Sequence, residues 1–446
     1  MLKKFYIPTN IFVFLIIIIG VFNYVFLFYG LYSRQNTVVL FINFALLFVC
    51  YFYILLCLKD YSYKKYNLLI YTSIFFRVLP ILSFPLLSDD FYRFIWDGHL
   101  LQTHINPFAF TPQQLVSLLT NELPINLFTK LNSPNYYSVY PPVNQFIFWL
   151  SAFANKNNLL LSVIIMRVCL VAFDIGNIIL LKKLLIIKKL KPELVFIYAL
   201  NPLVIIEFAG NLHFEVVMLF FTLLSVYFLL RRKNNWSAIS LGFAVCSKLL
   251  PLIFIPVMVK QIGWLKTMKY CLIVFFTTLI LFVPFIYNTE LLANFYSSLK
   301  LYYGNFEFNG SFYLLLKYLG WQYWGYNTLI YNSKILLLFT IVGFGYVYIK
   351  SKDIFESLFL ILFIYFVFSA VVHPWYILPM VALSVFVKWR FVVVWSALIG
   401  LSYYTYRIIP YEENTALLVL EYGLLFGYLI FEVITNVKNK YKNNII

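Results

Sequence analysis

Long apolar segments recur along the whole of this 446-residue chain, and they limit its possible folds more than any other feature. Hydrophobic residues make up 63% of the sequence and charged residues only 11%. A helix needs about 20 apolar residues to cross a bilayer, and its backbone polar groups must be satisfied within the segment itself. The sequence therefore predicts an all-α polytopic membrane protein in which residues 1–446 form a single domain.

Hydropathy divides the chain into full spans and shorter apolar segments. The predicted full spans cover residues 9–33, 37–58, 67–87, 158–181, 270–287, 327–349, 354–372, 391–409 and 416–435. The shorter segments cover residues 142–154, 193–207, 214–230, 236–247, 250–262 and 376–387. Short segments that contain Pro or meet at polar residues are typical of irregular helices that line a cavity. We expect 142–154 to be re-entrant or interfacial, and the bundle to contain about 12–14 transmembrane helices.

The net charge of +17 raises the question of nucleic-acid binding, but its distribution argues against it. Lys and Arg gather in short loops between apolar segments, and loops of this kind remain cytoplasmic. This pattern predicts a multi-pass protein of the cell membrane with both termini cytoplasmic, in contact with membrane lipids and without a nucleic-acid partner. Residues 88–140 and 288–325 then form two long extracytoplasmic segments. The first contains short pieces suited to amphipathic helices at the membrane surface.

Arg77, Arg167 and Lys248 are the basic residues predicted at membrane depth. Arg77 lies about ten residues from either end of its span, so a buried partner is expected. Arg167 and Asp174 are seven residues apart on one predicted helix, which places both on the same face, toward the bundle interior. We interpret these two as structural pairing partners rather than reactants.

The most polar run in the first half of the chain is Ser88–Pro107, directly after an apolar span. A helix through this run would place Asp89, Arg93 and Asp97 on one face. Two ordinary readings exist: an aspartate can cap the helix, and Arg93 with Asp97 can form an i, i+4 pair. Two adjacent aspartates exceed the need of one cap, however, and Arg93 would keep a nearby carboxylate ionised. We therefore predict Asp89 or Asp90 as a general base, because that role needs an ionised carboxylate.

Further residues from distant parts of the chain are predicted to converge on the same side of the membrane and to bind substrate. They are Arg93, Asp97, Glu207, His213, Glu215, Lys248 and His373, with the rings of Trp96, Tyr140, Trp375 and Tyr376 suited to stacking on a sugar. Lys248 separates two apolar half-helices, and it either snorkels to the interface or contacts a phosphate. His213 and Glu215 lack the spacing of a zinc motif, so we predict hydrogen bonding to a polar ligand and neither a metal nor another cofactor.

A resemblance to a known superfamily extends through these motifs. The first extracytoplasmic loop of GT-C glycosyltransferases that use polyprenyl-phosphate sugars, in particular the mannosyltransferase-like group, resembles the run SDDFYRFIWDGHLLQTHINPFAFTP. The resemblance continues through VYPPVNQFIF, NPLVIIEFAGNLHFE, the Lys-Leu-Leu-Pro run at 248–251 and HPWY at 373–376. The chain departs from the family where it has His213-Phe214-Glu215 instead of His-Asn-Asp, and where His99 stands in place of Arg after WDG.

This resemblance implies an integral membrane glycosyltransferase with a GT-C type bundle. It would move a hexose, with mannose the first expectation, from a polyprenyl-phosphate donor to a hydroxyl of a lipid-linked or cell-envelope glycan, with inversion, on the outer face of the membrane. Asp89 or Asp90 would activate the acceptor, and Lys248 with Arg93 would hold the phosphate. A transporter or flippase of lipid-linked sugars is the main alternative, and a scaffold without catalysis is the second.

Overall fold

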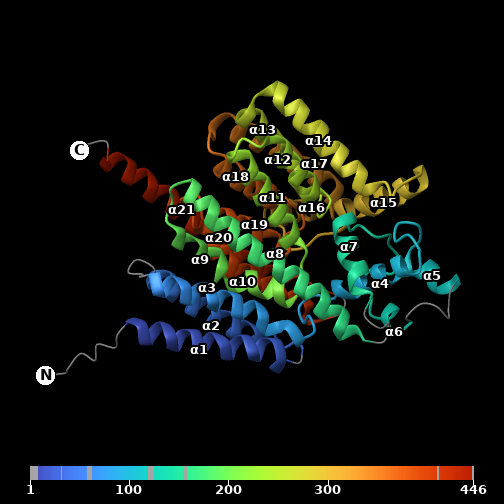
Figure 1. The fold of residues 1–446 in the computed structure, drawn as a ribbon, viewed down its shortest axis with the longest axis horizontal. Helices are drawn as coiled ribbons and strands as arrows, with labels where there is room; N and C mark the ends of the chain where they lie inside the picture. The colour runs from blue at the N-terminus through green and yellow to red at the C-terminus, as the bar shows by residue number, and fades with distance from the viewer. Residues whose placement is uncertain are drawn as a thin grey trace.

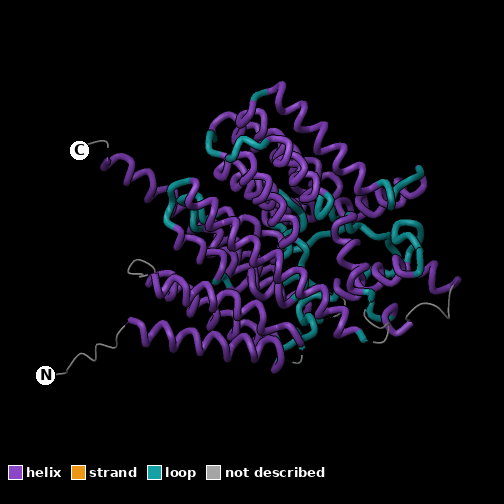
Figure 2. The backbone as a smooth tube through the Cα atoms, in the orientation of Figure 1, coloured by secondary structure: helices purple, strands orange, loops and turns teal. Residues whose placement is uncertain are grey.

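The computed structural model describes residues 9–31, 33–57, 63–118, 125–153, 158–408 and 411–443. Within these ranges the chain is helical and has no strand beyond an isolated parallel bridge between Phe308 and Val371. Figure 2 shows long helices joined by loops. Among the described residues, six helices are long and apolar enough to span a membrane, or seven if one bent pair counts as a span. The prediction of an all-α polytopic membrane protein is confirmed.

The first three long helices pack together along one side of the bundle (Figure 1). They and their short extensions are α1 (Thr9–Val25), η1 (Phe26–Gly30), α2 (Thr37–Leu56), α3 (Tyr63–Val78) and η3 (Leu79–Leu82). The predicted span 67–87 is shorter than expected. Its α-helix ends at Val78, because Pro80 has no amide hydrogen to continue the α-helical ladder and the chain tightens into a 3-10 turn.

The centre of the bundle combines one long helix with a broken segment. Its elements are α8 (Leu159–Ile187), η4 (Pro192–Val195), α9 (Phe196–Ala199), α10 (Pro202–Val204), η5 (Ile205–Gly210) and α11 (Glu215–Leu230). The two halves 192–199 and 202–210 meet at an angle of 56°. Asn201 stabilises this break, since its side chain accepts hydrogen bonds from the amides of Leu203 and Val204. The predicted irregular segment at 193–207 is confirmed.

A group of helices from the middle of the sequence covers one flank of the bundle (Figure 1). They are α12 (Asn234–Val245), η6 (Leu250–Phe254), α13 (Ile255–Ile262), α14 (Trp264–Phe282), α15 (Thr289–Asn305), α16 (Ser311–Trp324) and α17 (Leu329–Lys350). Many of their large apolar side chains are exposed, for example Leu265, Ile280 and Ile349. Such faces suit contact with lipid rather than with water.

The C-terminal elements return to the centre. They are α18 (Ile354–Val367), η7 (Pro374–Ile377), α19 (Leu378–Leu383), α20 (Phe391–Leu398), η8 (Ile399–Arg407) and α21 (Thr415–Asn443). Two predicted full spans are wrong in extent here. The span at 354–372 ends at Val367, because the chain then runs to the bridge at Val371, and the span at 391–409 becomes a 3-10 helix after Leu398. The total number of crossings stays a prediction.

The first predicted extracytoplasmic loop forms a separate group of short helices at one end of the bundle (Figure 1). It holds α4 (Asp90–Gln102), α5 (Pro112–Leu118) and α6 (Ile125–Phe128), and α7 (Pro142–Ser151) follows directly. Part of the predicted surface helices, 119–124, lies outside the described residues. The helices α4 and α7 approach closely, because a side chain at Gly98 would collide with the carbonyl oxygen of Phe148.

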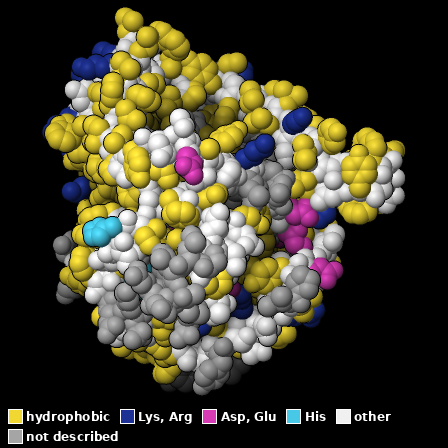
Figure 3. Space-filling view, turned by 90° about the vertical axis from the view of Figure 1, so that its right-hand side faces the viewer, with side chains coloured by type: hydrophobic (Ala, Val, Ile, Leu, Met, Phe, Trp, Pro, Cys, Tyr) yellow, Lys and Arg dark blue, Asp and Glu magenta, His cyan; other side chains and the backbone are white. Residues whose placement is uncertain are grey.

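The two ends of the bundle differ in character. The helix α1 begins and α21 ends at the same end, whereas α4, α5 and α6 lie at the opposite end (Figure 1). Seen from that opposite end, the surface is largely hydrophobic, with acidic and basic side chains between the apolar ones (Figure 3). This mixed surface suits the boundary between membrane and water.

The charged residues at membrane depth hold the central helices together. The Arg77 Nε lies 2.7 Å from an oxygen of Asp174, and both side chains are buried. The prediction that Arg167 pairs with Asp174 is wrong. Arg167 instead donates four hydrogen bonds to backbone carbonyls, two in the turn after α3 (Ile81 and Ser83) and two at the end of η5 (Ala209 and Gly210). The structural role is therefore correct, but the partner of Arg167 is the irregular backbone beside it.

Candidate active site

A cavity of about 1460 Å³ opens where α4, the end of η5 and the C-terminal segments meet. It is larger than a typical small-molecule site, which measures about 300–1,000 Å³. Ten of the predicted site residues line it: Asp89, Asp90, Arg93, Tyr140, His213, Glu215, Lys248, His373, Trp375 and Tyr376. Residues from five distant parts of the sequence therefore meet at one cavity.

Three predicted site residues do not line this cavity. Trp96 is buried against Phe128 at the back of α4, so it has no surface on which a sugar could stack. Asp97 and Glu207 are fully buried behind residues that do face the cavity. The prediction of direct substrate contact is corrected for these three, because neighbouring residues of the protein cover their side chains.

The two adjacent aspartates at the start of α4 do not act as side-chain caps. The amide of Asp90 instead donates to the hydroxyl of Ser88, at 3.3 Å. Asp89 pairs with Arg34 at 2.5 Å, and Asp90 accepts a hydrogen bond of 2.8 Å from the side-chain amide of Asn132. Both carboxylates thus face the cavity, and the capping reading does not explain them.

The environments of the two aspartates differ. Asp89 is half-buried and carries its ion pair with Arg34. Asp90 is half-buried, and its partial loss of solvation raises the pKa of its carboxyl, while His213 and the hydrogen bond from Asn132 act in the opposite direction. One oxygen of Asp90 has no hydrogen-bond partner among the described residues. Each aspartate therefore keeps one oxygen without a hydrogen-bond partner among the described residues, and the two differ in what engages the other oxygen: a cation for Asp89 and an amide for Asp90.

Arg34 is a site residue that the sequence analysis missed. Besides Asp89, it contacts the hydroxyl of Tyr411 at 3.2 Å and lies over the ring of Tyr406, 5.1 Å from the centroid. One signal was available: Arg34 lies in a predicted extracytoplasmic connection, where a basic residue runs against the usual charge distribution.

Arg93 and Asp97 form the predicted i, i+4 pair, with 2.8 Å between Nε and the carboxylate. Arg93 also donates to the carbonyls of Ser133 and Tyr136, and Asp97 accepts from the hydroxyl of Ser138 at 2.5 Å. These bonds fasten the segment 132–140 onto α4. The pair therefore shapes the cavity wall that carries Asn132 and Tyr140, and only Arg93 reaches the cavity itself.

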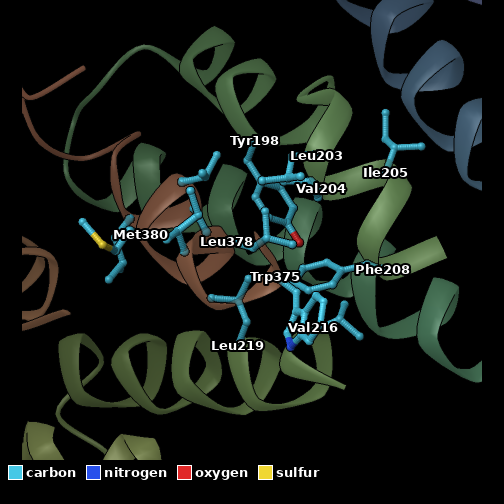
Figure 4. Packing of buried hydrophobic residues seen from close by; sticks show 14 of the residues in the cluster. Tyr198, Leu203, Val204, Ile205, Phe208, Val216, Leu219, Trp375, Leu378 and Met380 are labelled. Atoms are coloured by element: carbon cyan, nitrogen blue, oxygen red, sulfur yellow. The ribbon is translucent and has the colours of Figure 1, made fainter. Parts of the chain in front are cut away.

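A stack of rings forms part of the cavity wall. Trp375 lies between two histidines, with centroid distances of 3.7 Å to His213 and 4.5 Å to His373, and the rings are nearly parallel. Phe308 continues the stack beyond His373, at 4.4 Å. Figure 4 shows Trp375 beside Phe208 and Val216, so the hydrophobic core supports the centre of this stack.

The two histidines have different partners. The Nε2 of His213 lies 3.1 Å from a carboxylate oxygen of Glu207. The Nδ1 of His373 is buried and has no hydrogen-bond partner among the residues that the structure describes. Burial, with the nearby His213 and Lys248, lowers the pKa of His373 to about 3, so this ring is neutral.

Lys248 lies on the cavity wall and pairs with Glu215. Its ammonium nitrogen also lies over the ring of Tyr376, 3.9 Å from the centroid. The snorkelling alternative does not fit, because the side chain points to an acidic partner inside the protein. A cation that is held in this way, and still partly exposed to the cavity, can meet an anionic ligand.

A second charged group lines the far part of the same cavity, and the sequence analysis did not identify it. Glu307 accepts hydrogen bonds from Lys317 at 2.7 Å and Asn327 at 3.2 Å, and also from Tyr313. Burial acts to raise the pKa of Glu307, but the bonds from Lys317 and Tyr313 outweigh it and leave the pKa below its ordinary value. Glu413 lies nearby, and burial raises the pKa of its carboxyl.

The donor set of the cavity does not resemble a metal centre. In the described part of the chain, no three His, Cys, Asp or Glu side chains lie close enough together to hold a metal ion. Several acidic groups are engaged by a cation, as in the pairs Asp89 with Arg34 and Glu215 with Lys248. The site is instead a set of alternating carboxylates and cations beside aromatic rings, which suits a sugar phosphate.

Comparison with known proteins agrees with this chemistry. Residues 22–263 match the model of a family described as alpha-(1->6)-mannopyranosyltransferase, N-terminal domain. This segment is more than half of the chain and includes Asp89, Asp90, His213 and Lys248. No curated protein and no solved structure matches the chain. The chain belongs to the alpha-(1->6)-mannopyranosyltransferase family, and it is a membrane mannosyltransferase of the GT-C type.

Proposed function

We propose that this mannosyltransferase takes mannose from a polyprenyl-phosphate carrier and transfers it to a hydroxyl of a lipid-linked or cell-envelope glycan. The observation that carries the proposal is the composition of the cavity. Asp89 and Asp90, at the start of α4, line the cavity together with Lys248 and His213, and apolar side chains line the rest of it. A sugar joined to a lipid by one phosphate has matching groups: a polar sugar, a charged phosphate and an apolar tail.

Asp90 is proposed as the general base. Its free carboxylate oxygen takes the proton of the acceptor hydroxyl while the hydroxyl oxygen forms a bond to the anomeric carbon. The bond between that carbon and the phosphate oxygen breaks in the same step, and the lipid phosphate leaves with the electron pair. A phosphate monoester is a stable anion, so its departure needs no general acid. A single displacement of this kind inverts the anomeric centre.

Lys248 is proposed to hold the phosphate, with Arg93 as the second cation. The Lys248 ammonium is already oriented by Glu215 and Tyr376, so little side-chain freedom is lost on binding. A phosphate leaving group gains negative charge in the transition state, and a fixed cation stabilises that charge more than it stabilises the bound donor.

The apolar part of the cavity is proposed to take the prenyl tail. Leu314 and Leu315 of α16, Phe366 of α18, and Leu418 and Phe426 of α21 line it. Of these helices, α16 and α21 also expose large apolar side chains, such as Leu315 and Leu424, so a tail could enter sideways from the membrane. We infer in addition that the reaction takes place on the extracytoplasmic side, as the distribution of Lys and Arg predicts.

The experiment is reconstitution of the purified protein in liposomes with a synthetic α-mannoside acceptor. One sample receives polyprenyl-phosphate-β-mannose and a second receives GDP-mannose. We expect transfer only from the lipid donor, and NMR of the product should show an α-(1→6) linkage, as the family name describes. Transfer from GDP-mannose alone, or retention of the β configuration, would contradict the proposal.

A further inference from the structure

The cavity extends beyond the groups that the proposed reaction uses. Its volume of about 1460 Å³ exceeds the volume of a typical small-molecule site, which is about 300–1,000 Å³. The proposed base and phosphate contact, Asp90 and Lys248, belong to one set of lining residues. A second set, in the far part of the cavity, consists of Glu307 with Lys317 and Trp321 of α16. The proposed reaction gives this second set no role, so the far part offers polar groups to another ligand.

The segment that carries Glu307 is fixed to one end of the ring stack. The backbone of Phe308 forms two hydrogen bonds with residues 370–372, at 3.0 and 2.8 Å. The Phe308 ring lies 4.4 Å from His373, and the other end of the stack is His213. Glu307 is next to Phe308 in the chain, so the far part adjoins the end of the stack that is remote from His213.

The wall beside Asp90 also reaches the far part. The rings of Tyr136 and Phe306, which precedes Glu307 in the chain, meet edge to face with 6.3 Å between their centroids, and both residues line the cavity. The carbonyl of Tyr136 is fastened to α4, and the same segment carries Asn132, the partner of Asp90. A ligand with one hydroxyl at Asp90 can therefore extend along this wall into the far part.

Glu307 and Lys317 form a charged pair that offers both hydrogen-bond donors and an acceptor. One carboxylate oxygen accepts from Lys317 at 2.7 Å, and the other accepts from Asn327 and Tyr313. The side chains of Glu307 and Lys317 are 28% and 27% exposed, and both line the cavity. An ammonium group has three N–H donors, and Lys317 uses one of them among the described residues. A sugar presents neighbouring hydroxyls, each a donor and an acceptor, so it matches such a pair.

The helix α16 presents different side chains to different surroundings. Trp321, one turn after Lys317, is 52% exposed and lines the cavity, where the face of its ring suits stacking on a sugar. Trp324 is 63% exposed and does not line the cavity, which is typical of the aromatic belt at a membrane surface. Leu315 is two residues before Lys317 and therefore points to another side of the helix. The helix thus separates the apolar part of the cavity from its polar far part.

We propose that the far part of the cavity is a subsite for a second sugar of the acceptor glycan, adjacent to the sugar whose hydroxyl attacks. Glu307 and Lys317 bind hydroxyls of this second sugar, and Trp321 supports one face of its ring. The inference rests on the proposed function, since a glycan acceptor is part of it. A phosphate fits the far part less well, because two carboxyl groups, Glu307 and Glu413, accompany the ammonium of Lys317 there.

The test compares a one-sugar and a two-sugar acceptor with the full-length protein in liposomes, at saturating lipid donor. The probes are octyl α-mannoside and octyl α-(1→6)-dimannoside. In the wild type we expect the KM of the two-sugar probe to be about 10-fold lower, the effect of one charge-assisted hydrogen bond. Lys317→Met should remove this advantage without changing the KM of the one-sugar probe or of the lipid donor, and Trp321→Ala should act in the same direction. Lys317→Met leaves Glu307 its bonds from Asn327 and Tyr313, so the segment stays in place.

Trp324→Ala is the matched control, because it removes a similarly exposed ring of the same helix that does not line the cavity. Its KM values should equal those of the wild type. Equal KM values of the wild type for the two probes would overturn the inference, as would a proportional rise for both probes in Lys317→Met and Trp321→Ala. A rise in the KM of the lipid donor in Lys317→Met would overturn it as well, by assigning the far part to the phosphate. Failure of the wild type to use the lipid donor with either probe would instead refute the proposed function, so the two failures are distinguishable.

Discussion

Buried charge occurs in two regions of this molecule, and the two regions use it differently. Between the central helices, Arg167 donates four hydrogen bonds to carbonyls and Arg77 pairs with Asp174. On the cavity wall, Asp90 keeps an oxygen without a partner among the described residues, and Lys248 is partly exposed. Charge that is paired inside the protein therefore holds the bundle together, and charge that remains open to a cavity is available for chemistry.

The two regions are also connected. Arg167 holds the carbonyls of Ala209 and Gly210, at the end of the π-helix that contains Glu207. The loop that begins there carries His213 to the cavity wall. The structural region thus provides the rigid base on which the charges of the cavity are arranged, as a preorganised site requires.

The largest effect is expected for the general base on the cavity wall. Asp90→Asn should lower the rate of mannosyl transfer by about 10²–10⁴-fold, because it removes the general base while keeping the shape of the side chain. Asp89→Asn is the matched control and should cost much less, since Asp89 is engaged by Arg34. The assay is transfer from polyprenyl-phosphate-mannose in liposomes at equal protein. A greater loss in Asp89→Asn would move the role of base to that residue.

Substitutions of the paired charges between the central helices should change the stability of the protein and not its activity. Asp174→Asn leaves the buried guanidinium of Arg77 without its counter-charge, and breaking such a pair costs about 3–5 kcal/mol. Denaturant unfolding in detergent measures this change, and activity per folded molecule should remain close to that of the wild type. Asp353→Asn is the control: it breaks the half-exposed pair with Lys188 and should cost about 0–1 kcal/mol. Equal costs for both variants would erase the distinction between the regions.

Lys248→Met should affect donor binding. Loss of a charge-assisted contact to phosphate is worth about 1.5–3 kcal/mol, which corresponds to a KM for the donor about 10- to 150-fold higher. Lys317→Met, at the far part of the cavity, serves as the comparison, because Lys317 is engaged by Glu307. If Lys317→Met raised the KM for the donor more than Lys248→Met, the phosphate would bind beside Lys317 and not beside Lys248.

The smallest effect concerns pH. Partial burial raises the pKa of Asp90, so transfer should decline on acidification at a pH above the ordinary aspartate value of about 3.9. The contribution of Asp90 to the stability of the fold should change with pH in the opposite direction. A carboxyl with a raised pKa binds its proton more tightly in the folded state, so the contribution of Asp90 falls as pH rises through its folded pKa. Thermal unfolding should therefore show Asp90→Asn slightly more stable than the wild type at neutral pH, and lower stability would contradict the assignment.

Much of this arrangement is predictable from the sequence, because it depends on patterns within short segments. The start of α4 at Asp90 follows from a polar run after an apolar one, and the break near Asn201 follows from short segments with Pro. The membrane class follows from composition alone. Ten of the predicted site residues line one cavity, since polar groups at the ends of spans on one side of a membrane tend to converge.

The parts that sequence reasoning missed depend on contacts between distant segments. Trp96 and Tyr140 are both aromatic residues in one loop, and only the packing of α4 against α6 and α7 decides that Trp96 is buried. Arg167 and Asp174 share a helix face, yet the arginine meets an irregular turn whose carbonyls are better placed. The partnership of Arg34 with Asp89 joins residues 55 positions apart, and periodicity contains no information on such pairs.

The most direct test of the central claim, that one cavity holds the acids of α4 and the lipid phosphate together, is a structure of the protein with a non-transferable polyprenyl-phosphate-mannose analogue. We expect the phosphate within hydrogen-bond distance of Lys248, the anomeric carbon turned toward Asp90, and the tail along α16 and α21. A phosphate bound beside Lys317, with the sugar turned away from α4, would contradict the account.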